Sequence, residues 1–425
     1  MNRLPFRLIV ALSVLLPILA SCTPLFGSRE SGSGGGNPGG GGPGGDPGGG
    51  VTYTLTVTVE GEGSVSVSPV KAVYNSGELI TITAVPDPDH FLSHWGGDAE
   101  GWILSPLLLG IGADTSITAV FSPDLWSRAT ETAGWSARDG HAVVSFDDRL
   151  WVLGGLDGGG NPLNDVWSWS SEGSEAWAQV TAGAPWEART GHGAVVHAVN
   201  EGDDEEIWII GGAYRNDVWR STNGEDWTEV TVTDPWSART EFLTLAHGDS
   251  LWVLGGLDGG TVLNDVWSST DGVTWAPVSP TGEIWSPRRG HAGVVFDGKL
   301  WVIGGVGEGG ALLSDVWYSD DGETWEQATA DAGWPVRSGH AAAVHNSWIW
   351  VFGGTPDLGI RRYRDVWSSS DGVDWTAEPH GSWSPRSRHR ALSHDNRLWM
   401  IGGAARWPGQ FSSKMRDVWY LPVPQ

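Results

Sequence analysis

Residues Arg288 to Gly305 read RRGHAGVVFDGKLWVIGG, and Ser314 to Ser319 follow as SDVWYS. Short runs rich in apolar and β-branched residues, bounded by Gly and Asp, predict three β-strands. The segment ETWEQAT, beginning at Glu323, predicts a fourth strand, and Asp321-Gly322 before it predicts a two-residue hairpin of type I′. The apolar runs are nearly continuous, which indicates strands that are covered on both faces of their sheet.

Three markers of this stretch recur six times over the last three hundred residues, at spacings between 44 and 57 residues. They are an arginine (Arg138, Arg189, Arg239, Arg288, Arg337, Arg386), a glycine pair (154–155, 211–212, 255–256, 304–305, 353–354, 402–403) and Asp-Val-Trp (from Asp165, Asp217, Asp265, Asp315, Asp365, Asp417). A fixed period of this length is the signature of a repeat architecture. Six copies of a four-stranded unit predict an all-β fold with a six-bladed β-propeller over residues 123–425.

The double glycine followed by spaced aromatic residues resembles the Kelch repeat, and the resemblance covers residues 135 to 420 approximately. It implies a propeller similar to the central domain of galactose oxidase. The stretch SDDGETW, from Ser319 to Trp325, also resembles the Asp-box of sialidases, although it is one residue short. In both cases the resemblance implies four-stranded blades around a channel.

The ends of the repeat region predict how the ring closes. The sixth copy stops at DVWYLPVPQ and lacks a fourth strand. Upstream of the first copy, Leu125 to Thr130 resembles that missing strand, because Trp126 precedes Trp135 by the same nine residues that separate Trp325 from Trp334. We therefore expect residues 125–130 to complete the last blade, which would remove a free sheet edge.

The N-terminus predicts export. Arg3 and Arg7 precede a short apolar stretch, and Leu19-Ala20-Ser21-Cys22 ends it. These four residues resemble the lipobox of bacterial lipoproteins, which implies a signal peptide over 1–22, lipidation at Cys22 and an anchor in the cell envelope. Thr23, in place of the Asp typical of inner-membrane retention, favours the outer membrane or cell surface. An ordinary signal peptide with an incidental Cys is the alternative.

Two further segments separate this anchor from the repeats. Residues 23–50 form a linker, whose part from 31 to 50 holds thirteen Gly and three Pro and cannot bury a core. Residues 51–122 change to strict alternation, as in TYTLTVTVE and GELITITAVP, which predicts a small β domain. The order of its segments resembles the bacterial repeat domain related to the internalin B-repeat, which implies a spacer or adhesion unit. His90 and His94 are expected in a loop beside a buried Trp95.

Composition limits the classes of function. The net charge is −26, which argues against nucleic acid as a partner, because phosphate binding needs a basic surface. The single Cys excludes an internal disulfide framework. We predict no cofactor and no metal site, a monomeric state, and contact with a membrane through the N-terminal lipid only.

The regular residues of the repeat are expected to be structural. Histidine follows the repeated arginine by three positions in five copies (His141, His192, His291, His340, His389). Repetition in every copy is what a structural role predicts, and we expect the six Asp of Asp-Val-Trp to cap backbone amides at the glycine pairs. Copy three departs from the pattern with Glu241 and Phe242. An anion or metal site at these rings is the alternative.

The irregular loops between second and third strands are the predicted binding site. In copies five and six they read TPDLGIRRYR and AARWPGQFSSKMR, and the region from Arg361 to Arg416 holds ten Lys or Arg against five acids. The candidate ligand-binding residues are Arg361, Arg362, Tyr363, Arg364, Arg406, Trp407, Phe411 and Lys414. Aromatic and basic side chains together suit a sugar ring that carries a carboxylate or sulfate. Two solvated loops with scattered charge are the alternative.

These features predict a surface-anchored binding protein that presents its propeller to a glycan, peptide or protein partner, including an anionic one. The alternative is a propeller enzyme acting on sugars, similar to a sialidase or a sialic-acid epimerase. The thioether-linked Cys of galactose oxidase has no counterpart in the repeats. No catalytic residues are predicted, because no nucleophile and base stand out together.

Overall fold

The computed structural model describes residues 51–422, except 101, 103–104, 172–175, 200–202, 234, 358–360 and 407–412. The predicted signal peptide, the lipidation site at Cys22 and the linker lie outside the described residues. Within the described part of the chain, no helix has the length and hydropathy that a membrane span requires.

The upstream domain consists of two three-stranded sheets and a short two-stranded ladder. Their orders are β2 (Leu55–Glu60), β8 (Thr115–Pro123), β6 (His90–Gly97); β3 (Gly63–Ser68), β5 (Glu78–Pro86), β7 (Leu107–Ile111); and β1 (Thr52–Tyr53), β4 (Tyr74–Asn75). Alternation buries one face of each sheet, and Trp95 lies fully buried in the shared core. His90 and His94 belong to strand β6, so the predicted loop is wrong there. Among the described residues, no group of three or more His, Cys, Asp or Glu is placed to hold a metal.

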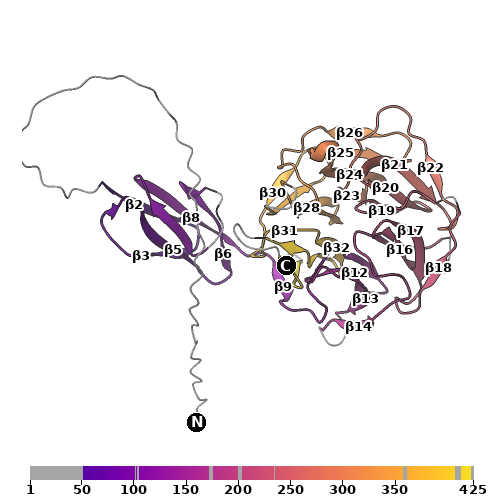
Figure 1. Ribbon diagram of the computed structural model, residues 1–425, viewed down its shortest axis with the longest axis horizontal. Helices are drawn as coiled ribbons and strands as arrows, with labels where there is room; N and C mark the ends of the chain where they lie inside the picture. Colours follow the sequence, from indigo (N-terminus) through magenta and orange to yellow (C-terminus); the bar gives the residue numbers. More distant parts are fainter. Residues whose placement is uncertain are drawn as a thin grey trace, which may run out of the picture. The chain divides into compact units, whose positions relative to one another are not determined.

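In the described part of the repeat region, six sheets each contain a four-stranded antiparallel path, one for each copy of the motif. Figure 1 shows them arranged radially, with the first strands near the centre and the fourth strands at the rim. The first strands are β11 (Ala142–Phe146), β15 (Gly193–His197), β19 (Leu243–His247), β23 (Ala292–Phe296), β27 (Ala341–His345) and β32 (Arg390–His394). The second strands are β12 (Arg149–Asp157), β16 (Glu206–Gly212), β20 (Ser250–Asp258), β24 (Lys299–Val306), β28 (Trp348–Gly354) and β33 (Arg397–Ile401).

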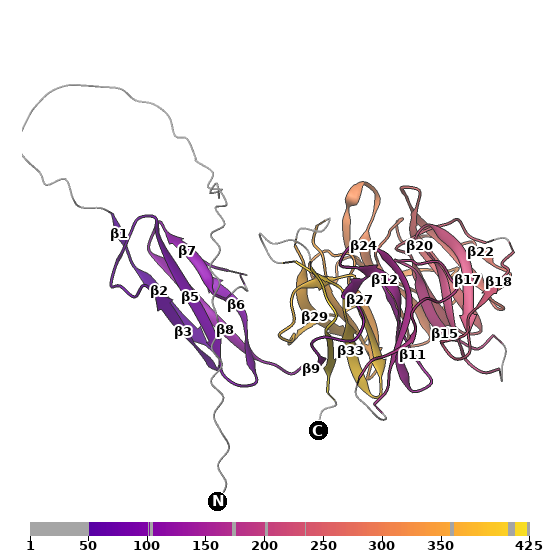
Figure 2. The same ribbon diagram turned by 60° about the horizontal axis from the view of Figure 1, so that its bottom comes forward.

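The outer half of each sheet is formed by a third and a fourth strand. The third strands are β13 (Pro162–Trp169), β17 (Arg215–Ser221), β21 (Thr261–Ser269), β25 (Leu312–Ser319), β29 (Tyr363–Ser369) and β36 (Val418–Leu421). The fourth strands are β14 (Ala178–Thr181), β18 (Thr228–Val230), β22 (Ala276–Val278), β26 (Glu326–Thr329), β30 (Thr376–Glu378) and, for the last sheet, β9 (Ser127–Thr130). Short additional elements are β10 (Arg138–Asp139), β31 (Arg386–Ser387), β34 (Ala404–Ala405), β35 (Ser413–Lys414) and the 3₁₀ turn η1 (Glu308–Gly310). Figure 2 shows the strands from the side.

Both faces of these sheets are buried because neighbouring sheets pack on them. In strand β24 every residue after Lys299 is buried, as the continuous apolar run predicts. Each hydrophobic cluster joins two adjacent copies, for example Leu254 with Leu300. Trp285 packs edge-on against Trp325 with ring centroids 5.9 Å apart, and large rings of this kind fill the widening space between sheets.

The turn between third and fourth strands differs from the predicted two-residue hairpin. Six residues separate β25 from β26, and Gly322 has a positive φ of 74°, whereas Asp321 is not among the positive-φ residues that a type I′ turn would require. The Asp321 carboxylate instead accepts the amides of Glu323 and Thr324 at 2.8 Å each. Ser319 accepts the Gly322 amide at 2.8 Å, so the side chains organise the turn.

The closing strand is confirmed. Strand β9 pairs antiparallel with β36, with Arg128 opposite Trp419 and Thr130 opposite Val418. Trp126, just before β9, is 4% exposed and packs edge-on on Trp383 with centroids 4.8 Å apart. The start of the region therefore completes the sheet formed by its end.

A ring of backbone hydrogen bonds also closes around the channel. It passes through the second residue after each repeated arginine: Gly140, Gly191, Glu241, Gly290, Gly339 and Arg388. Each amide donates to the carbonyl of the preceding copy, and the Gly140 amide donates to Arg388 at 3.0 Å. The ring places one residue of every copy beside the axis, at the end of the channel where the first strands begin.

Candidate functional site

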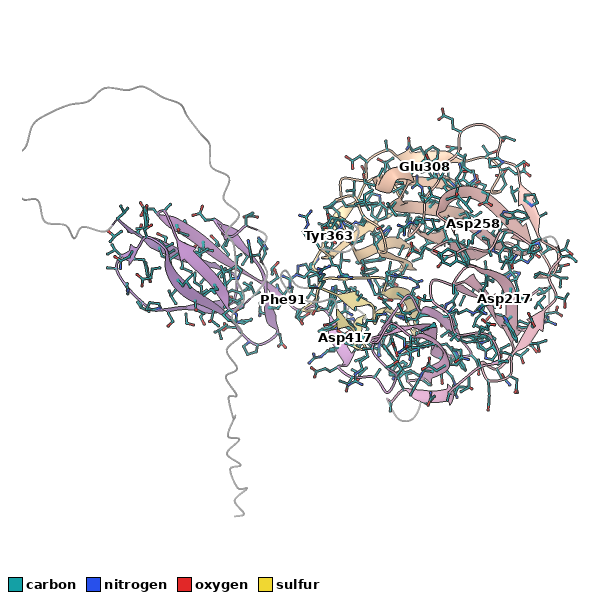
Figure 3. All side chains as sticks on the ribbon, viewed as in Figure 1. Phe91, Asp217, Asp258, Glu308, Tyr363 and Asp417 are labelled. Carbon is teal, nitrogen blue, oxygen red and sulfur yellow. The ribbon has the colours of Figure 1, made fainter. Side chains whose placement is uncertain are left out.

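The six repeated arginines are structural. All are fully buried, and each forms two parallel hydrogen bonds with the Asp of its own Asp-Val-Trp, as in Arg138 to Asp165 at 2.7 Å twice. Arg138 also donates to the carbonyl of Gly154 at 2.8 Å. The Trp167 indole donates to the same Asp165 carboxylate at 2.8 Å. The predicted role of the Asp residues as amide caps is therefore wrong, because Arg and Trp side chains occupy their oxygens. Figure 3 labels two of these carboxylates, Asp217 and Asp417.

We expect Asp165→Asn to destabilise the fold by about 3 kcal/mol, because removing one partner of a buried pair leaves the other charge uncompensated. Arg138 would then lie fully buried beside a neutral amide. Urea unfolding of the variant measures this loss.

Asp374→Asn is the matched control, since that carboxylate is exposed and far from the arginines in sequence. An equal loss of stability in both variants would contradict the assigned role of Asp165.

The five repeated histidines pack against the glycine pairs and are neutral. Gly154 has a φ of 54°, and a Cβ there would lie 2.9 Å from the carbonyl oxygen of Leu163 and 3.2 Å from the imidazole of His192 in the next copy, so glycine is favoured at this position. Burial lowers the pKa of His192 to about 3, and the charge of Arg189 acts in the same direction. Burial likewise lowers the pKa of His291 to about 3. These rings therefore lie in the packed wall of the channel as uncharged groups.

Charged side chains line the mouth of the channel at positions where most copies carry small residues. Asp139 and Arg289 follow the repeated arginine of their copies directly. Glu241 and Arg388 stand two positions after it, and Arg390 stands four positions after it. Together with Asp357 and Arg362 from the loop after β28, they line a cavity of about 440 Å³, which we call the mouth cavity. Four arginines face three carboxylates there, in a chain whose net charge is −26.

Glu241 is held by arginines from two other copies. Its carboxylate forms a close ion pair with Arg289 of the next copy. The guanidinium of Arg388, from the copy across the ring, lies 3.8 Å from the other carboxylate oxygen. Arg289 is thus the tight partner and Arg388 the loose one.

Arg390 is the least compensated cation of the mouth cavity. Its one hydrogen bond within the described residues is a long contact of 3.4 Å to the carbonyl of His389, and no described carboxylate lies within 4.0 Å of it. Burial lowers the pKa of Arg390 to about 10, the charge of Arg388 lowers it further, and Asp139 opposes this shift. A partly buried guanidinium without a counter-charge is suited to receive an anionic group.

The structure distributes the predicted loop residues over different surroundings. Arg362 lines the mouth cavity and donates to the hydroxyl of Ser387 at 2.8 Å. Lys414 does not line this cavity, but its ammonium donates to the carbonyl of Leu156 at 2.9 Å and lies 3.4 Å from the carboxylate of Asp139, which does line it. Arg362 is therefore the predicted residue that the structure brings into the cavity, and Lys414 contacts one of its carboxylates.

Three other predicted residues do not line the mouth cavity. Arg361 is exposed and pairs with Asp357. The ring of Tyr363 stacks on the buried Arg337, with 4.9 Å from the guanidinium to the ring centroid. Arg364 contacts Leu92 instead.

Arg364 donates to the carbonyl of Leu92 at 3.0 Å and lies over the ring of Phe91. Burial lowers the pKa of Arg364 to about 10. Arg406 is partly buried. Burial lowers the pKa of Arg362, and the charge of Arg406 lowers it further. Trp407 and Phe411 lie outside the described residues.

Comparison with known proteins agrees with this architecture. Residues 140–354, just over half of the 425, match the KLHDC2/KLHL20/DRC7 Kelch-repeats domain. The chain belongs to the Kelch-repeat family. Residues 53–125 match the divergent InlB B-repeat domain, so the Kelch domain follows a B-repeat module.

A solved structure described as "Structure of YjhT" shares the fold, with a TM-score of 0.54 at 15% sequence identity over 68% of this chain and 96% of that chain. At this identity the likeness concerns the fold alone. No curated protein matches the chain. A Kelch propeller is compatible with a protein-interaction module or with an enzyme, so function depends on the residues of the site.

The charges just before and at the start of the first strands were not among the predicted site residues. Their signal was present in the sequence, because Glu241 and Arg388 replace a Gly found in the other four copies of the Kelch motif. Comparing each copy with the others at every position after the repeated arginine would also have identified Asp139, Arg289 and Arg390. The prediction used the irregular loops and treated the first strands as regular.

Proposed function

We propose that this protein is an envelope-anchored binding protein whose Kelch propeller receives an anionic group of its ligand in the mouth cavity. The observation that carries the proposal is Arg390, a partly buried guanidinium without a carboxylate partner among the described residues. A ligand carboxylate or sulfate would supply the missing counter-charge through charge-assisted hydrogen bonds.

The surrounding cavity supports this proposal by its size and its polarity. Its volume of about 440 Å³ suits one sugar residue or a few peptide atoms rather than a polymer. The chain as a whole is strongly anionic, so long-range repulsion disfavours polyanions, whereas a single anionic group can reach the local arginines. Acidic sugars and acidic peptides are the ligand classes that fit.

The proposed location follows from the N-terminal residues. Lipidation of Cys22 would hold the protein at the outer membrane or cell surface, with residues 23–50 as tether. The propeller would then meet ligands outside the cytoplasm. Metabolic labelling with an alkyne fatty acid tests this anchor, because Cys22→Ala should abolish the label.

A second candidate, an enzyme acting on acidic sugars, is favoured by one observation. Glu241 and Asp139 place two carboxylates among the arginines of the same cavity. Such carboxylates can serve as acid and base if a substrate binds between them. Product formation therefore has to be followed together with binding.

The test is titration of the purified full-length chain with sialylated and sulfated glycans, by calorimetry and with product analysis of the mixtures. We expect binding without turnover, and Arg390→Gln should weaken it about tenfold or more, since a charged hydrogen bond is worth roughly 1.5–3 kcal/mol. Arg390→Lys should retain part of the affinity, because it keeps the charge.

Arg361→Gln is the matched control, since the Arg361 side chain is exposed and does not itself line the mouth cavity, although its partner Asp357 does. Its affinity should stay within about twofold of the parent chain. Turnover would favour the enzyme instead. Equal losses of glycan affinity in the Arg361 and Arg390 variants would indicate that the ligand binds at the loop and not in the cavity.

A further inference from the structure

Two residues of opposite charge interrupt the backbone ring at the channel mouth. Four of the six ring positions are glycine, and the other two are Glu241 and Arg388. Both have a φ of 56°, in the left-handed region that favours glycine. Non-glycine residues are strained in this region, so the ring keeps two side chains at positions that glycine would occupy without strain.

Their positions in the ring bring the two side chains together across the channel. Glu241 is the third member and Arg388 the sixth, so three steps separate them in either direction. The Arg388 guanidinium nevertheless lies 3.8 Å from the Glu241 carboxylate. The ion pair therefore spans the ring, and Arg289 holds the Glu241 end.

Arg390 lies further along the first strand than this ion pair. It begins β32 and pairs with Ile401, two residues beyond Arg388 and away from the mouth. The other five copies have small or aliphatic residues at its position: Ala142, Gly193, Leu243, Ala292 and Ala341. Arg390 is thus the one charged residue at this position of the repeat, and its side chain lines the same cavity as Glu241 and Arg388.

We infer that Glu241 and Arg388 form a latch across the channel mouth, which the anionic group of the ligand opens by replacing Glu241 on Arg388. Glu241 remains on Arg289, which is its tighter partner, and the released Arg388 then faces the ligand together with Arg390. The inference rests on the proposed anion binding in the same cavity and adds that Glu241 opposes it. Glu241 is a positioning residue here, because it acts through Arg388.

Chemical modification of arginine tests the latch without any ligand. The full-length chain is treated with phenylglyoxal, and mass spectrometry measures the rate at which Arg390 is modified relative to the rate for the exposed Arg149. Glu241→Gln removes the charge, and Glu241→Gly introduces the residue that four of the other five copies have at this position, so that variant is expected to fold. We expect the relative modification rate at Arg390 to rise about fivefold in both Glu241 variants. A solvent-accessible ion pair contributes up to about 1 kcal/mol, and its loss corresponds to a change of about that size.

Glu187→Gln is the matched control, because it breaks the ion pair with Arg215 outside the mouth cavity. A rise at Arg390 of the same size in this control would overturn the latch, since it would report general loosening. An unchanged rate in both Glu241 variants would also overturn it.

Glycan titration of the same variants separates the latch from the proposed function. The latch predicts tighter binding of the acidic glycans by Glu241→Gln, and weaker binding would overturn the latch. If no variant binds any glycan while the modification rate at Arg390 still rises, the Glu241–Arg388 ion pair shields Arg390, but the proposed binding of acidic glycans and the opening of the latch by them are both rejected.

Discussion

Deleting residues 123–131 is expected to lower the melting temperature of the propeller by more than about 10 °C. The deletion removes β9, so β36 becomes a free edge and the first and last copies lose their shared sheet. It also removes Trp126, which packs on Trp383 and Phe352 in the core between the last two sheets. Differential scanning calorimetry of the full-length chain measures the loss.

Trp126→Ala removes only the buried ring of this segment. It should lower the free energy of unfolding by about 3–5 kcal/mol, as large-to-small substitutions of buried Trp do. Trp102→Ala is its control, because that side chain is 49% exposed in the upstream domain. A melting curve that is unchanged by the deletion would show that the ring does not depend on the borrowed strand.

Acidification from pH 6.5 to 4.5 is expected to unfold the propeller. The five repeated histidines are buried, and burial lowers the pKa of each. In His192 and His291 the pKa falls to about 3. Below pH 6.5 the unfolded chain binds protons that the folded chain excludes, so stability is complete above this pH and falls as the pH decreases toward 3. Each such histidine loses about 1.4 kcal/mol of stabilisation per pH unit, or roughly 3 kcal/mol at pH 4.5.

The protein offers its own control, since Phe242 occupies the histidine position in copy three. His291→Phe should reduce the slope of stability against pH by the equivalent of one proton over this range. Urea unfolding at half-unit pH steps measures both slopes. A stability that does not change between pH 6.5 and 4.5 would show that these histidines are not buried as neutral groups.

Much of the fold could be predicted because the same pattern of strands occurs in six copies of the repeat. Strand positions, the burial of both sheet faces and the closing strand follow from apolar runs and from the tryptophan spacing, which are local patterns. The turn at Asp321-Gly322 was predicted wrongly. The side chains of Ser319 and Asp321 accept backbone amides of the turn, which favours a longer loop than the Asp-Gly dipeptide suggests.

The candidate site could be predicted only in part. Arg362 lines the mouth cavity and Lys414 contacts its Asp139, whereas Tyr363 and Arg364 are occupied by contacts that no loop sequence reveals. The sequence places Glu241 and Arg388 far apart, and only closure of the ring brings their charges within 3.8 Å.

The sequence by itself determined that this chain builds a six-fold repeat of short buried strands, and that residues 125–130 belong to its last unit. Periodicity suffices for this, because each copy buries its apolar residues against the next in the same way. Only the tertiary structure decided that the regular Arg and Asp pair with each other and that the irregular charges meet at one channel mouth. Radial closure superimposes equivalent positions around an axis, so rare departures from the repeat become neighbours there whatever their distance along the chain.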